Sequence, residues 1–223
     1  RDFCLSRGLG DVYKRQASLN VLSIVFTGLR SVYANIAQLR IKCAYSIAKR
    51  YLCTMENAIG LFSRLGCRLR GFGDDARTRE VIGRACRENG WFTPADICRA
   101  VAAVADGMLR RDALAEWLAP YPVPVAEPRR VLVVMAGNIP LVGFFDMLCV
   151  LAAGHRCLVK PSAKDTVLME YVIGLLRGID PQVPVEFYDG STSPDAVIAT
   201  GSDNANRYFR AQYAGIPALL RGN

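Results

Sequence analysis

The stretch VLVVMAGNIPLVGFFDMLCVLAAGHRCLVKPS, residues 131–162, decides the fold that this sequence predicts. Residues 131–135 are an unbroken apolar run, which is typical of a strand buried on both faces. A helix over residues 141–153 then leads to a second strand over residues 157–159. The stretch therefore predicts a βαβ unit whose two strands end at Gly-Asn-Ile-Pro and at Lys-Pro-Ser.

The remainder of the second half continues the same alternation of strands and helices. The expected elements are a helix at 164–177, strands at 183–187 and 196–199, a helix at 204–213 and a strand beginning at 218–220. Alternation with short connections favours a parallel, doubly wound sheet. Because the last strand begins so near the final residue, we expect the sheet to be incomplete.

Residues 55–128 differ from the second half in pattern. Residues 55–119 carry apolar side chains at helical spacing, and Thr93-Pro94-Ala95-Asp96 is typical of a helix start, with a capping hydroxyl before proline. Four prolines between Pro120 and Pro128 indicate an extended linker. The fold class predicted is α/β, with a helical region over 55–128 followed by an incomplete parallel sheet over 129–223.

The basic character of the chain belongs to its first quarter. Residues 1–54 hold nine of the 28 Lys and Arg and two of the 20 Asp and Glu, and so account for +7 of the net charge of +8. This segment could be a signal peptide, another targeting segment, or a non-native read-through. We favour the last, with Met55 as the natural start, because CLSRGLGDVYKRQ resembles translated adapter sequence. The rest of the chain shows no basic patch with interleaved aromatics, so nucleic-acid binding is not expected.

The composition excludes several other classes of protein. A hydrophobic content of 52% with 22% charged residues indicates a globular chain. The longest apolar run in residues 17–54 is about eleven residues, whereas a membrane span needs about 20, so no stable span is expected. The eight cysteines form no CxxC pair and there is one histidine, so we expect no metal site and free thiols in a reducing cytoplasm.

Three of these residues receive specific interpretations. Cys149 lies within the apolar helix and Cys157 opens a buried strand, so both are interpreted as core residues. His155 lies in the turn between helix and strand, at the edge of the sheet opposite the predicted ligand loops. We expect it to be a surface turn residue and not a catalytic base.

The connection after the first strand offers groups that could bind a ligand. In doubly wound sheets, ligands bind at the carboxyl ends of the strands. Gly137 lets the backbone approach a ligand closely, and Asn138 offers an amide donor. Pro140 suits the start of a helix, whose N-terminal amides favour an anion or a developing negative charge. The ordinary alternative is that Gly-Asn-Ile-Pro is only a turn.

Two further connections should open on the same edge of the sheet. Lys160 with Ser162 could bind ribose hydroxyls or a phosphate, and Thr200-Gly201-Ser202 at a helix start would suit a pyrophosphate or a nicotinamide ribose. A solvated strand-end lysine and an ordinary helix cap are the ordinary alternatives. The G-x-G-x-x-G fingerprint of standard dinucleotide folds is absent.

The motifs GNIP, LVKPS and ATGS, in this order, resemble those of the aldehyde dehydrogenase superfamily. The fuller text of residues 55–223 looks more similar to the acyl-CoA reductases, a branch that includes the fatty-acyl reductase of bacterial luminescence. The resemblance implies an oxyanion-hole role for Asn138, cofactor ribose contacts for Lys160 and Ser162, and a turn beside the cofactor at residues 200–202. Gly137 belongs to the same cofactor-binding set.

The resemblance implies NADPH-dependent reduction of an acyl-CoA thioester to an aldehyde through a cysteine acyl-enzyme, with NADH possible as cofactor. Two departures from the family pattern limit it. Asn206 stands where aldehyde dehydrogenases commonly have a second glycine, and the family's nucleophilic cysteine lies beyond Asn223, so residues 1–223 alone are expected to be inactive. An NAD(P)-dependent aldehyde dehydrogenase and a non-catalytic nucleotide-binding module are the alternatives. A homo-oligomer is possible for the full-length protein.

Overall fold

A computed structural model describes residues 55–121 and 123–222, so the expectations for residues 1–54 lie outside the described residues. Residues 55–118 are helical, as expected. The elements are α4 (Met55–Leu69), α5 (Ala76–Glu88), α6 (Pro94–Ala102), the π-helical segment η1 (Ala103–Met108) and α7 (Arg111–Leu118).

The helix starts follow from capping side chains that the sequence displays. The Thr93 hydroxyl accepts from the Asp96 N–H (3.1 Å) and Pro94 is the first helical residue, which confirms the predicted start of α6. The Asp75 carboxylate accepts from the Thr78 N–H (2.8 Å) and caps α5 in the same way. Each helix turns an apolar stripe inward, and α4 and α5 both lie against α9 of the second half.

The second half is a five-stranded parallel sheet in the order β3-β2-β1-β4-β5, which confirms the predicted fold class. The strands are β1 (Arg130–Val134), β2 (Arg156–Lys160), β3 (Val185–Phe187), β4 (Ala196–Gly201) and β5 (Ala218–Gly222). The connecting helices are α8 (Phe144–Ala152), α9 (Thr166–Ile179) and α10 (Asp203–Gln212). The strand order reverses between β1 and β4, which are neighbours in the sheet although β2 and β3 separate them in the chain.

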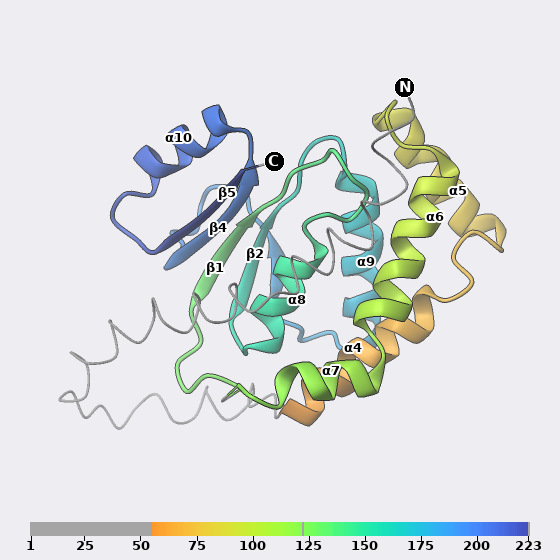
Figure 1. Cartoon of the computed structure of the whole chain (residues 1–223), viewed down its shortest axis with the longest axis horizontal. Helices are drawn as coiled ribbons and strands as arrows, with labels where there is room; N and C mark the ends of the chain where they lie inside the picture. Colours follow the sequence, from red (N-terminus) through yellow and green to blue (C-terminus); the bar gives the residue numbers. More distant parts are fainter. Residues whose placement is uncertain (1–54, 122, 223) are drawn as a thin grey trace. The chain divides into compact units, whose positions relative to one another are not determined.

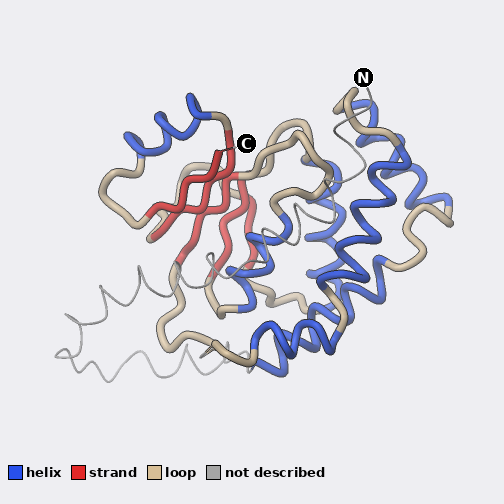
Figure 2. The backbone as a smooth tube through the Cα atoms, in the orientation of Figure 1, coloured by secondary structure: helices blue, strands red, loops and turns tan. Residues whose placement is uncertain are grey.

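Helices cover the two faces of the sheet because successive crossovers run in opposite directions from β1. The crossovers through α8 and α9 move towards β3, and the crossover through α10 moves towards β5, so right-handed connections place α10 on the opposite face (Figures 1 and 2). Phe209 and Tyr213 of this last helix region pack against Leu132 and Val197 of the sheet. The strands are buried on both faces, with runs of consecutive buried residues in β1, β2 and β4.

No helix in the described ranges is long and apolar enough to cross a membrane.

Candidate functional site

The carboxyl ends of β1, β2 and β4 meet at one edge of the sheet, as parallel pairing requires. Val134 pairs with Lys160 on one side and with Ala199 on the other. The connections that follow these strands are the asparagine loop (residues 135–143), the lysine loop (residues 160–165) and the turn at 200–202. This edge includes the point between β1 and β4 where the strand order reverses, which is where doubly wound sheets bind ligands.

Gly137 brings the asparagine loop into close contact with the lysine loop. A Cβ at Gly137 would lie 2.4 Å from Ser162 Oγ and 2.6 Å from Ser162 Cβ, well inside van der Waals contact. On the other side, the Asn89 side-chain amide donates to the Gly137 carbonyl (2.9 Å), so the end of α5 also fixes this backbone. The structure thus brings together Gly137 and Ser162, two of the predicted site residues, and shows that only glycine fits here.

Asn138 is exposed at this edge. The expectation that Pro140 begins a helix is wrong, because α8 begins at Phe144. Leu141 instead takes a left-handed backbone conformation (φ 57°), which interrupts any helix at this point. The asparagine loop therefore presents Asn138 from a turn and not from a helix N-terminus.

The lysine loop carries two exposed cations. Lys160 is the last residue of β2, and Lys164 lies over the ring of Trp91 with its Nζ 4.5 Å from the ring centroid. The Ser162 hydroxyl accepts from the Lys164 N–H (3.3 Å), and the Ser162 carbonyl accepts from the Thr166 hydroxyl (3.0 Å). The loop is held by its own hydrogen bonds, and the ammonium of Lys160 faces solvent.

The expectation for residues 200–202 needs a correction, because Thr200 and Gly201 belong to β4 and pair with Arg221 and Gly222 of β5. Ser202 follows as the cap of α10, where its hydroxyl accepts from the Ala205 N–H (3.4 Å). This hydroxyl therefore serves its own helix, as in the ordinary interpretation.

Asn206 fills space near the same turn. It is buried, its side-chain amide donates to the Gly201 carbonyl (3.4 Å), and its Oδ1 has no partner among the described residues. The Asn206 side chain therefore occupies space at the start of α10 that a glycine at position 206 would leave open for a pyrophosphate.

An ion pair between a buried aspartate and a partly exposed arginine lies beside this turn and was not predicted. Arg221 of β5 pairs with Asp146 in the first turn of α8 and also donates to the Thr200 hydroxyl (3.1 Å). Burial raises the pKa of Asp146, and the Arg221 charge opposes that rise. The signal in the sequence was an acid inside the otherwise apolar segment FFDMLCVLA.

A second unpredicted carboxyl, Asp165, ends the lysine loop and reaches the asparagine loop. Its side chain is buried, and its Oδ2 accepts from the Leu141 N–H (2.7 Å). Burial raises the pKa of Asp165 to about 8, although the hydrogen bond from Leu141 opposes the rise.

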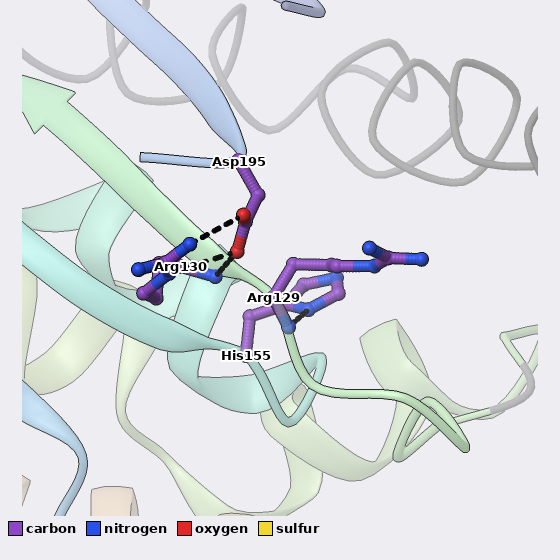
Figure 3. Close-up of polar contacts among 4 residues, drawn as sticks. All are labelled: Arg129, Arg130, His155 and Asp195. Carbon is purple, nitrogen blue, oxygen red and sulfur yellow. Dashed lines mark hydrogen bonds and ion pairs between the residues drawn. The ribbon is translucent and has the colours of Figure 1, made fainter. Parts of the chain in front are cut away.

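The interpretation of His155 as a surface residue is wrong, although it does lie at the opposite edge of the sheet. His155 is fully buried. The linker lies against the neighbouring residue, since a Cβ at Gly154 would lie 2.7 Å from Pro124. Its Nδ1 accepts from the Arg129 N–H (3.0 Å), as Figure 3 shows. Burial lowers the pKa of His155 to about 4, so the imidazole is neutral at pH 7.

The same edge holds an ion pair that closes the start of β1. Asp195 accepts from the Arg130 N–H (2.9 Å) and from both sides of the Arg130 guanidinium, at 3.1 and 2.8 Å (Figure 3). The Arg130 side chain lowers the pKa of Asp195. Arg130 and Asp195 therefore bind one another at this edge, whereas the buried His155 Nε2 and Arg129 Nε have no partner among the described residues.

Cys149 and Cys157 are buried in the core, as predicted. Burial raises the pKa of both thiols, so neither is a thiolate at neutral pH. Within the described ranges, no group of His, Cys, Asp or Glu is arranged to hold a metal ion.

Comparison with solved structures finds this fold in two larger enzymes. A betaine aldehyde dehydrogenase double mutant from Staphylococcus aureus, in complex with NAD+ and with a BME-modified cysteine, matches with a TM-score of 0.52 and 16% identity over 75% of this chain and 38% of that chain. Proline utilization A (PutA) with proline bound in remote sites matches with a TM-score of 0.59 and 15% identity over 95% of this chain and 23% of that chain.

The fold is that of an aldehyde dehydrogenase-type α/β sheet. This chain spans well under half the length of both structures, and at this identity the likeness concerns the fold alone. No protein-family model matches the sequence, and no curated protein sequence matches it either.

Proposed function

We propose that this chain carries the oxyanion and cofactor-ribose loops of an NADPH-dependent reductase that converts an acyl-CoA thioester into an aldehyde. The observation that carries the proposal is the contact between the asparagine and lysine loops, where Gly137 lies so close to Ser162 that no side chain fits. In support of the proposal, the exposed Asn138 and the exposed strand-end Lys160 lie in the two loops that make this contact, at the edge where doubly wound sheets commonly bind ligands.

The residues at this edge fit a nicotinamide nucleotide at its adenosine ribose. Lys160 and Ser162 would hold the ribose hydroxyls or a 2′-phosphate, because the Lys160 ammonium is exposed at the end of β2 and the serine lies two residues later. Residues 200–202 would lie beside the remainder of the cofactor. Asn206 makes the start of α10 a poorer pyrophosphate site than a glycine would, so we expect the ribose end to supply most of the affinity.

The chemistry needs a thiolate and a donor for the oxyanion. A cysteine thiolate attacks the thioester carbonyl, coenzyme A leaves as a thiolate that takes up a proton, and an acyl-enzyme remains. NADPH, when bound, would supply the hydride, so that acyl-CoA, NADPH and a proton yield aldehyde, coenzyme A and NADP+. Asn138 would donate from its side-chain amide to the oxyanion that forms when the carbonyl carbon becomes tetrahedral.

The buried cysteines of the described ranges do not fit the role of nucleophile. Cys149 lies in the middle of α8, and Cys157 lies at the start of β2, which is the edge opposite Asn138. The other described cysteines, Cys67, Cys86 and Cys98, lie in helices α4, α5 and α6 and not in the three loops of the candidate site. The proposal therefore assigns the nucleophile to a segment outside the described ranges. Sequencing the genomic locus across both ends of the reading frame, to look for a cysteine codon a few tens of residues after Asn223, tests this requirement.

Oxidation of an aldehyde by NAD(P)+ is the second candidate function. The fold match to a betaine aldehyde dehydrogenase bound to NAD+ favours it. Both reactions would use the same oxyanion donor and the same cofactor site, so these residues do not distinguish them. Steady-state assays of the full-length protein with acyl-CoA plus NADPH, and with free aldehyde plus NAD(P)+, separate the two.

Nucleotide binding by residues 1–223 is the first test of the cofactor site. We expect saturable binding of NADPH, followed by its fluorescence, and about a tenfold or greater loss of affinity in Lys160→Ala, because a charge-assisted hydrogen bond is removed. If Lys160 contacts the 2′-phosphate, the loss will be larger for NADPH than for NADH. Arg64→Ala removes an exposed cation of α4 and serves as the matched control. Absence of binding of either nucleotide to the folded chain would refute the proposed site.

A further inference from the structure

Asp165 lies in an unusual place for a carboxyl group, because its side chain is 4% exposed between two loops of the candidate site. Its Oδ2 accepts a 2.7 Å hydrogen bond from the Leu141 N–H, 24 residues earlier in the chain. Its Oδ1 is buried and has no partner among the described residues. A buried polar atom without a hydrogen-bond partner lowers the stability of the fold, so the single hydrogen bond that this carboxyl makes needs an explanation.

Capping of the following helix does not explain this aspartate. Asp165 occupies the N-cap position of α9, where an aspartate side chain commonly accepts from the first amides of its own helix. Here the side chain makes no capping hydrogen bond. Asp75 shows the ordinary arrangement in the same chain, since its carboxylate accepts from the Thr78 N–H of the helix that follows it. The Asp165 carboxyl is directed to the other loop instead.

The residue that Asp165 holds has a strained backbone. Leu141 has a φ of 57°, and among the described residues other than glycine it alone has a positive φ. A leucine adopts this conformation only when its surroundings impose it. Two contacts do so: the Leu141 side chain is fully buried, and its N–H is held by Asp165. This turn fixes the direction in which the chain passes from Asn138 to α8.

We propose that Asp165 is a positioning residue for Asn138, which it keeps beside the lysine loop by holding the left-handed turn at Leu141. The idea rests on the proposed function for the meaning of Asn138, but the geometry of the loop can be tested without it. Asp165 accepts from the Leu141 N–H, and the Asn89 side-chain amide donates to the Gly137 carbonyl. Two hydrogen bonds thus fix the asparagine loop, one on each side of the exposed Asn138.

The protonation state of Asp165 supplies a conservative variant for the test. Burial raises the pKa of this carboxyl to about 8, so it is mostly neutral at pH 7. Since Oδ2 accepts from Leu141, a neutral carboxyl carries its proton on Oδ1. Asparagine reproduces this pattern of one acceptor and one donor, whereas alanine removes the acceptor. Asp165→Asn should therefore keep the loop in place and Asp165→Ala should release it.

The test is site-resolved amide hydrogen exchange by NMR on residues 1–223 and on three variants. In Asp165→Ala we expect the Leu141 and Val142 amides, which donate to Asp165 and to the Ile139 carbonyl, to exchange about 10- to 100-fold faster, while the Val133 amide inside β1 keeps its protection relative to global unfolding. Asp165→Asn should restore the wild-type rates. Asp75→Ala, the matched control, removes an aspartate at another helix start and should leave the Leu141 amide unchanged.

The outcomes show whether Asp165 positions the asparagine loop or only stabilises the core. Equal loss of protection at Leu141 and Val133 would mean that Asp165 stabilises the whole fold and would overturn the proposal. Unchanged exchange at Leu141 would overturn it as well. Failure of Asp165→Asn to restore the loop would overturn it too. A parallel titration with NADPH reports on the proposed function independently: if the loop responds as expected and no nucleotide binds, the positioning stands and the function fails.

Discussion

Replacement of Gly137 by alanine tests the contact on which the proposed site depends. The added Cβ would meet Ser162 Oγ at 2.4 Å and Ser162 Cβ at 2.6 Å, and Lys164 Cβ at 3.2 Å. The first two distances are shorter than any ordinary contact, and the Ser162 Cβ is attached directly to the backbone. The lysine loop must therefore move away from the asparagine loop in this variant.

The size of the effect follows from overpacking in a fixed environment. Forcing one methyl group into a filled site typically costs about 1–3 kcal/mol. For a chain of this length, each 1 kcal/mol lowers Tm by about 2–4 °C. Because the displaced loop carries Lys160 and Ser162, NADPH affinity should fall more than the loss of stability alone would cause.

The assay combines urea denaturation with NADPH titration, and a second substitution locates the clash. Ser162→Gly removes both short contacts, so Gly137→Ala combined with Ser162→Gly should be more stable than the sum of the two single losses predicts. Gly174→Ala is the control, because Gly174 lies inside α9 with no neighbour within 4 Å of an added Cβ. It should stabilise the chain by about 0.5–1 kcal/mol. A Gly137→Ala variant as stable as wild type, with unchanged NADPH affinity, would show that the two loops do not touch.

Three further predictions follow from buried groups. The pKa of His155 is about 4 in the folded chain and near 6.5 in the unfolded chain, so the neutral imidazole stabilises the fold above pH 6.5 and this contribution is lost towards pH 4. In urea titrations, the difference in free energy of unfolding between wild type and His155→Asn should therefore change by about 3 kcal/mol between pH 7 and pH 4. A difference that stays constant over this range would contradict the lowered pKa of His155. Arg221→Met should lower the free energy of unfolding by about 3 kcal/mol, because it leaves Asp146 buried without its cation, and adding Asp146→Leu should recover most of this loss. A loss of less than about 0.5 kcal/mol in Arg221→Met, the size expected for an exposed ion pair, would show that the pair does not stabilise the fold. Cys149 and Cys157 should resist alkylation at pH 8 in the native chain and react in denaturant, as peptide mapping by mass spectrometry would show, and rapid native labelling of either would refute their burial.

The fold could be predicted because its signals are local. The apolar run at 131–135 and the strand at 157–159 lie within two residues of β1 and β2, and the alternation of elements determines a parallel sheet. The helix expected at 141–153 begins at Phe144 instead. The apolar pattern continues through Leu141, but it carries no information about the sign of φ. It therefore could not predict the left-handed turn at this residue.

The site could be predicted only where its residues act from their own loop. Gly137, Asn138 and Lys160 stand at strand ends that the alternation of elements locates. Asp165 and Asp146 act on partners 24 and 75 residues away, and no short pattern reports such a distance. His155 was misplaced for the same reason, since its Nδ1 accepts from the N–H of Arg129, 26 residues earlier in the chain.

The two edges of the sheet differ in how tightly their polar side chains are bound within the chain, and this difference determines where the protein can be redesigned. At the edge of His155 and Asp195, the Asp195 carboxylate and the His155 Nδ1 bind donors of Arg130 and Arg129, so a substitution of either residue changes folding first. At the opposite edge Asn138 and Lys160 are exposed, so loop libraries at these two positions can be varied while the paired strands keep their register.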